Sequence, residues 1–202
     1  MGRRSGACPD GLGRRARLLE IHAGNGLVFT ETVLKGAFVI EPEKHEDFRG
    51  FFARTFCADE FARHNLETAV AQTSISYNPS KGTLRGMHYQ APPFEETKLV
   101  RCTMGAIHDV ILDLRTDSPT FKRSFGVELS AQNRKALYIP RGFAHGFQTL
   151  EDNSEVLYQM SVPYSAKQAR GVRWDDPAFG IAWPDGARII HERDRSYPDF
   201  RG

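Results

Sequence analysis

The chain has 202 residues, which is enough for one well-packed domain and no more than a small appendage beside it. Its 27 basic and 25 acidic residues give a formal charge of +2, and no basic stripe runs through the body of the chain, so we expect no nucleic-acid partner. No apolar run approaches the roughly 18 residues that a membrane helix needs, so we expect no membrane partner either.

The first part of the chain differs in composition from the rest. Five of the first 17 residues are arginines, and Asp10 is the only acidic residue among them. We expect residues 1–26 to form a basic, flexible leader and residues 27–202 to form a single domain. The cysteines Cys8, Cys57 and Cys102 are widely spaced and include no CxxC pair. This argues against a disulfide framework or a zinc site and favours a cytoplasmic protein.

Short strands separated by turns follow the leader. In chain order we expect strands at 27–30, 37–40, 98–103, 106–114, 123–129, 137–139, 146–150 and 155–162, with a short helix at 58–63. The segments between them are rich in Gly, Pro, Asn, Asp and Ser, which tolerate turn geometry. Many short strands with little helix predict a β-sandwich or barrel, in which the barrel mouth is the natural ligand site.

Strand alternation is clearest in residues 106–114, where even-numbered positions fall on one face and odd-numbered positions on the other. Asp109 and Asp113 share the odd face with Ile107 and Ile111, which is unusual for an ordinary core. These carboxylates face either a polar cavity or the solvent side of an outer sheet.

Two of the seven histidines stand in segments with unusual local constraint. His88 lies in residues 82–90, GTLRGMHYQ, where glycines on both sides of Arg85 permit a close approach of the backbone. Alternation predicts that Gly86 and His88 share one strand face and that Arg85 and Met87 share the other.

His145 lies in residues 139–147, IPRGFAHGF, where a Pro-x-Gly-x-x-His turn leads the histidine into the start of a strand. This segment resembles the second half of the cupin pattern. A metal-binding cupin carries a second histidine in its first motif, and here that motif reads His88-Tyr89-Gln90. Two histidines with Glu95 or Glu96 remain an alternative metal site, because non-haem iron uses such a set.

Read over residues 29–200, the chain resembles the dTDP-4-dehydrorhamnose 3,5-epimerase family. The signature segments stand in order: DFRGFF at 47–52, LRGMHYQ at 84–90, KLVRC at 98–102, DLR at 113–115, SPT at 118–120, IPRGFAHGF at 139–147, LY at 157–158, WDDP at 174–177 and RD at 193–194. The resemblance implies an all-β cupin or jelly-roll barrel with a few short helices. It also implies a homodimeric isomerase that acts on a nucleotide-sugar substrate.

The chemistry of this family explains the residue types. A carbonyl at C4 of a hexose makes the hydrogens on C3 and C5 acidic, because the carbanion is delocalised as an enolate. Epimerisation then needs a base on one face of the ring, an acid on the other and a donor at O4. The resemblance assigns these roles to His88, Tyr158 and Lys98, and assigns Asp194 to orienting His88. No metal and no other cofactor is expected.

The nucleotide end of such a substrate needs cations for the diphosphate and a surface for the base. Guanidinium groups offer paired donors to phosphate oxygens. Aromatic rings suit stacking on the pyrimidine, and two further polar side chains would contact the sugar or hold His88 and Lys98. The resemblance gives these substrate-binding residues as Arg49 and Arg85, Phe51 and Tyr164, and Gln72 and His145.

The sequence departs from the family pattern at three places. The closing segment is His191-Glu192-Arg193-Asp194 instead of Ser-x-Lys-Asp. Arg141 replaces a glutamate, which would alter the charge near the cavity mouth. An extra residue lies within 75–79 and would reshape the sugar pocket. Alternative functions are therefore epimerisation at one carbon, another nucleotide-linked keto-sugar, a metal-dependent cupin reaction, or binding without catalysis.

Overall fold

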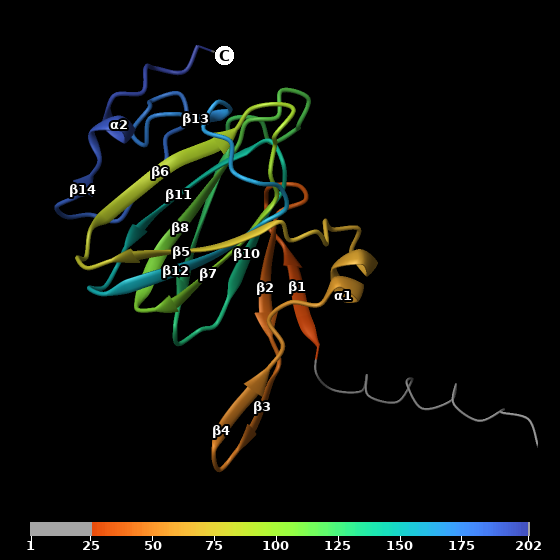
Figure 1. Ribbon diagram of the computed structural model, residues 1–202. Coiled ribbons are helices and arrows are strands. Elements are labelled where there is room, and N and C mark those ends of the chain that lie inside the picture. The colour runs from red at the N-terminus through yellow and green to blue at the C-terminus, as the bar shows by residue number, and fades with distance from the viewer. Residues whose placement is uncertain (1–25, 202) are drawn as a thin grey trace, which may run out of the picture.

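The computed structural model describes residues 26–201, and it forms two facing β-sheets with short peripheral elements (Figure 1). The leader expected at 1–26 lies, but for its last residue, outside the described part. No helix in residues 26–201 combines the length and apolar character needed to cross a membrane.

The first sheet has six strands in the order β1-β2-β10-β7-β12-β5, and every neighbouring pair is antiparallel. The bounds are Leu27–Glu31 (β1), Phe38–Pro42 (β2), Ala136–Ile139 (β10), Lys98–Met104 (β7), Ser154–Met160 (β12) and Gln72–Asn78 (β5). β5 is an edge strand, since β12 is its only partner in the described chain.

The second sheet has the order β13-β6-β11-β8-β9, and β14 joins the edge of β6 in parallel. The bounds are Ala169–Gly171 (β13), Thr83–Gln90 (β6), Phe143–Thr149 (β11), Ala106–Asp113 (β8), Ser124–Ser130 (β9) and Ile189–Ile190 (β14). The remaining elements are the hairpin of β3 (Lys44–Asp47) and β4 (Gly50–Ala53), and the helices α1 (Ala58–Arg63) and α2 (Glu192–Arg195).

The main core fills the space between the sheets. Val100 and Val156 of the first sheet pack in one cluster with Ile107, Ile111 and Phe147 of the second. The even positions of β8 instead pack on the outer side of the second sheet, against the segment that follows β13. The alternation predicted for residues 106–114 is therefore confirmed, and the all-β barrel architecture is confirmed with it.

Strand β6 does not follow simple alternation, and the predicted faces were wrong there. His145 pairs with His88 and Phe147 pairs with Arg85, so β6 advances three residues where β11 advances two. Such a bulge turns residues three apart toward the same side. Arg85 and His88 consequently both face the cavity between the sheets, although the sequence pattern placed them on opposite faces.

The bulge depends on glycine. Gly86 adopts a φ of +140°, and a Cβ added there would lie 2.5 Å from the Cα of Gly146 on β11. Only a residue without a side chain allows the two strands to approach this closely.

Most of the expected elements are present. The helix at 58–63 is confirmed, and the eight expected strands correspond to β1, β2, β7, β8, β9, β10, β11 and β12. Strand β11 begins at Phe143, three residues earlier than predicted. The β3–β4 hairpin and strands β5, β13 and β14 were not predicted from the sequence. Cys57 and Cys102 are free thiols, whereas Cys8 lies outside the described residues.

Candidate active site

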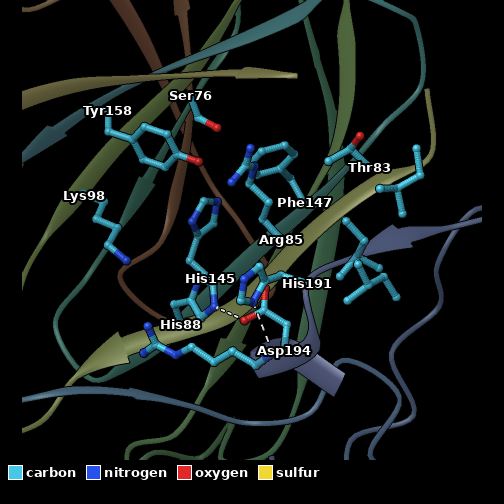
Figure 2. A pocket seen from close by; sticks show the side chains of 14 residues that line it. Ser76, Thr83, Arg85, His88, Lys98, His145, Phe147, Tyr158, His191 and Asp194 are labelled. Carbon is cyan, nitrogen blue, oxygen red and sulfur yellow. Dashed lines mark hydrogen bonds and ion pairs between the residues drawn. The ribbon is translucent and has the colours of Figure 1, made fainter. Parts of the chain in front are cut away.

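A cavity of about 640 Å³ opens between the two sheets near β14 and α2 (Figure 2). Ser76, Lys98 and Tyr158 line it from the first sheet, and Arg85 and His88 are among those that line it from the second. A smaller lobe of about 220 Å³ shares four lining residues with it: His88, Lys98, Tyr158 and Arg193. The two lobes therefore meet at three of the four side chains expected to be catalytic.

His88 is fixed by a carboxylate that is distant in sequence. Its Nε2 atom lies 2.7 Å from Oδ1 of Asp194, which stands in α2 and is 4% exposed. Oδ2 of Asp194 accepts a hydrogen bond from the Gly86 N–H. Burial opposes ionisation of Asp194, but these hydrogen bonds outweigh it and lower the pKa of the carboxyl. The carboxylate leaves the other ring nitrogen of His88 to act on a ligand.

Tyr158 approaches the same cavity from β12 on the opposite sheet (Figure 2). Burial raises the pKa of its phenol well above the usual range, and the nearby negative charge of Asp109 adds to this effect. The phenol therefore keeps its proton at neutral pH. A protonated hydroxyl that faces the cavity can donate that proton to a ligand.

His145 lies between these two groups and has its own aspartate. It pairs directly with His88 in the strand register, and its ring meets the Tyr158 ring edge-on at 5.9 Å between centroids. Its Nε2 atom lies 2.7 Å from Oδ1 of the fully buried Asp109. Of the two orientations expected for Asp109, a polar cavity or the solvent side of a sheet, the structure shows the first. Asp109 faces the interior, where His145 is its partner.

Asp113 also points inward, but it has no part in the cavity. Its carboxylate accepts hydrogen bonds from the side chains of Arg115, Ser118 and Thr120. This cluster ties the end of β8 to the following turn, so its role is structural.

Lys98 enters the cavity at the start of β7. Its Nζ atom lies 2.9 Å from Oε1 of Glu96, and both side chains are almost buried. Glu96 itself lines the smaller lobe. The ammonium is therefore held beside His88 and Tyr158 by a carboxylate from the segment between β6 and β7.

Arg85 and Arg193 add positive charge along the cavity wall. Nε of Arg85 donates to Oδ1 of Asn78 at the end of β5, so this end of β5 positions the arginine. Nε of Arg193 donates to the Tyr197 hydroxyl. These cations suit an anionic ligand such as a diphosphate.

The structure does not bring Arg49 and Phe51 to this cavity. Both lie in the β3–β4 hairpin, which extends away from the sheets on the side remote from β14 and α2 (Figure 1). Arg49 pairs there with Asp47, and its side chain is largely exposed. Within one chain these two residues do not reach the cavity, so their contact with the ligand stays a prediction.

The other expected binding residues lie at the cavity or next to it. Tyr164 lines the smaller lobe, whereas Gln72 does not line either lobe and accepts a hydrogen bond from the Tyr164 N–H at 2.5 Å. Arg141 forms an ion pair with Glu67 and lines neither lobe.

Several residues that line the cavity were not predicted individually from the sequence. Ser76, Thr83 and Phe147 line the larger cavity because of their strand faces. From the sequence, Glu96 is predicted only as a ligand of the alternative metal site, but both of its carboxylate oxygens have protein partners. Within residues 26–201, no three His, Cys, Asp or Glu side chains lie together in a way that could hold a metal ion.

Comparison with known proteins gives one consistent result. A model of the dTDP-4-dehydrorhamnose 3,5-epimerase family matches residues 31–202. A protein of that description from Sinorhizobium fredii is 42% identical over 163 residues, which cover 80% of this chain and 84% of the relative.

Solved structures agree with this match. The dTDP-4-dehydrorhamnose 3,5-epimerase of Bacillus anthracis, with TDP and pyrophosphate bound, has a TM-score of 0.84 at 39% identity and covers 87% of this chain and 100% of its own. ChmJ, a 3'-monoepimerase from Streptomyces bikiniensis in complex with dTDP-quinovose, has a TM-score of 0.78 at 33% identity and covers 83% of this chain and 85% of its own.

Proposed function

The chain belongs to the dTDP-4-dehydrorhamnose 3,5-epimerase family, and we propose how its cavity carries out the reaction of that family. The protein is an isomerase that epimerises a dTDP-4-keto-6-deoxy sugar. One observation carries the proposed mechanism. His88 and Tyr158 come from opposing sheets and face one cavity, so a sugar ring between them is exposed to a base and an acid on opposite faces.

His88 acts as the base. Its free ring nitrogen removes the proton from the carbon next to the C4 carbonyl, and the C–H electrons move into an enolate with negative charge at O4. Asp194 stabilises the imidazolium and fixes the tautomer through the 2.7 Å contact. Because Asp194 is ionised at neutral pH, the pair gains an attraction when the histidine becomes charged.

Tyr158 acts as the acid. Its hydroxyl delivers a proton to the same carbon from the other face, so the configuration inverts when the enolate collapses to the ketone. The Lys98 ammonium stabilises the enolate oxygen, since a fixed positive charge in a partly buried site costs no reorganisation during the reaction.

The nucleotide end is held by cations and an aromatic ring. Arg85 and Arg193 are available to the diphosphate, and Tyr164 is available to the base. Arg49 and Phe51 can serve the same ligand only from a second copy, because their hairpin points away from the cavity of its own chain. The exposed aromatic side chains of that hairpin, with Phe48 98% exposed, support a homodimer in which each hairpin reaches the partner.

The free thiols of Cys57 and Cys102 support a location in the reducing cytoplasm.

The direct test uses dTDP-4-keto-6-deoxyglucose in heavy water, followed by proton NMR. The enzyme is expected to introduce deuterium at both C3 and C5 and to form the inverted product. Absence of exchange at both carbons would contradict the function. Exchange restricted to one carbon would instead support the single-carbon alternative, which the similarity to a monoepimerase keeps open.

A further inference from the structure

We propose that Glu96 is a positioning residue, which holds the Lys98 ammonium where negative charge develops on the substrate. This inference rests on the proposed function, in which Lys98 stabilises the enolate. Glu96 lies two residues before Lys98, in the connection between β6 and β7, and it lines the smaller lobe beside His88 and Tyr158.

The ion pair between these residues is short and secluded. Nζ of Lys98 lies 2.9 Å from Oε1 of Glu96, and the side chains are 12% and 10% exposed. A lysine has a flexible four-carbon stem and three rotating donors, so it does not fix its own position. A buried carboxylate restrains one donor and leaves the other two for the ligand. Glu96 therefore supplies the rigidity that the lysine lacks.

Glu96 is itself anchored from a second strand. Its Oε2 atom accepts a hydrogen bond from Nε2 of Gln90, at 3.2 Å. Gln90 is 4% exposed and ends β6, two residues after His88. Its Oε1 atom accepts a hydrogen bond from the Ser165 N–H at 2.6 Å. Lys98 is thereby tied to the strand that carries the base and to the segment that carries Tyr164. This chain of contacts fixes the distance between the base and the ammonium.

The charged side chains that line the smaller lobe also support a role for Glu96 in holding Lys98. Lys98, Arg170 and Arg193 are its cations, His88 can become one, and Glu96 is the one carboxylate among these lining residues. Asp194 is already bound to His88. One carboxylate therefore serves the base, and the other serves the lysine.

Two variants separate position from charge. Glu96→Gln keeps the length of the side chain and an oxygen that can accept from Lys98, but it removes the negative charge. Glu96→Asp keeps the charge but is shorter, so the ammonium must shift to follow it. If position matters, we expect kcat of Glu96→Gln to fall less than about 5-fold and that of Glu96→Asp to fall about 10- to 100-fold. The dissociation constant for dTDP should stay within about 2-fold in both variants.

Glu96→Gln and Glu96→Asp are then each combined with Lys98→Met, and the rate of deuterium exchange is measured for both double variants. With the lysine gone, the two Glu96 variants should differ by less than about 2-fold. Glu95→Gln, on the adjacent residue, serves as the matched control and should match the wild type.

The proposal is overturned if Glu96→Asp is the more active variant, or if both match the wild type. It also fails if the difference between them persists without Lys98. Failure of the wild-type protein to catalyse exchange would instead refute the proposed function.

Discussion

Among single residues, the proposed mechanism depends on pairs in which one side chain fixes another. Asp194 holds His88, Asp109 holds His145, and Glu96 holds Lys98. In each pair a buried or nearly buried carboxylate determines where a cavity residue points. Preorganisation of this kind is what electrostatic catalysis requires.

Replacing Asp194 tests the first of these pairs. Asp194→Asn keeps the shape but removes the charge that stabilises the His88 imidazolium, so we expect kcat to fall roughly 10²-fold, within the range of general-base effects. Binding of dTDP, measured by calorimetry, should change little. An Asp194→Asn enzyme with wild-type kcat would show that His88 does not depend on this carboxylate.

At the scale of elements, the sequence predicts strands well where alternation reflects burial. Strand β8 is the best example, because its two faces pack in different clusters. The residues of β3 are all exposed and polar, so this strand has no apolar period to detect. Strand β5 is short of apolar residues, and its two apolar side chains, Ile75 and Tyr77, are exposed at a sheet edge, so its alternation does not reflect burial. The bulge in β6 also has no periodic signal, and it is this bulge that brings Arg85 and His88 to one side.

The turn after β8 gives a prediction for stability. Burial opposes ionisation of Asp113, but hydrogen bonds from Arg115, Ser118 and Thr120 hold its pKa at about 2. A carboxyl with a lowered pKa in the folded state stabilises the fold above its ordinary pKa, and that contribution is lost as pH falls from about 4 to about 2.

We expect Asp113→Asn to lower the free energy of unfolding by about 3 kcal/mol at neutral pH, because it breaks a buried ion pair. The difference from the wild type should shrink as the pH approaches about 2. Urea denaturation at several pH values measures this, with the exposed Asp117→Asn as control. A pH-independent difference would contradict the linkage.

At the scale of the whole molecule, the sequence and the single chain give different parts of the site. The sequence motifs supply His88, Lys98, Tyr158 and Asp194 only through family resemblance, since no local spacing joins β6, β7, β12 and α2. The structure brings these four together in one chain. It leaves Arg49 and Phe51 apart from these four, and we therefore propose that the two residues act in the site of a second copy.

Mixing inactive variants tests the shared site. If the hairpin acts on the partner, a dimer of one His88→Asn chain and one Arg49→Ala chain contains one site with both native residues. After subunit exchange, about a quarter of the sites should then be fully active, as random pairing in a two-fold dimer predicts. Measured activity should exceed the sum of the two variants alone. No recovery in a mixture that has been shown to contain heterodimers would place Arg49 outside the partner's site.

Deuterium exchange on dTDP-4-keto-6-deoxyglucose by two single variants tests the proposed roles of His88 and Tyr158. His88→Asn is expected to abolish exchange at both C3 and C5. Tyr158→Phe is expected to retain more exchange than inversion, because a removed proton can return to its original face. Substantial exchange by His88→Asn, or equal losses of exchange and inversion in Tyr158→Phe, would contradict a base and an acid acting from opposite sheets.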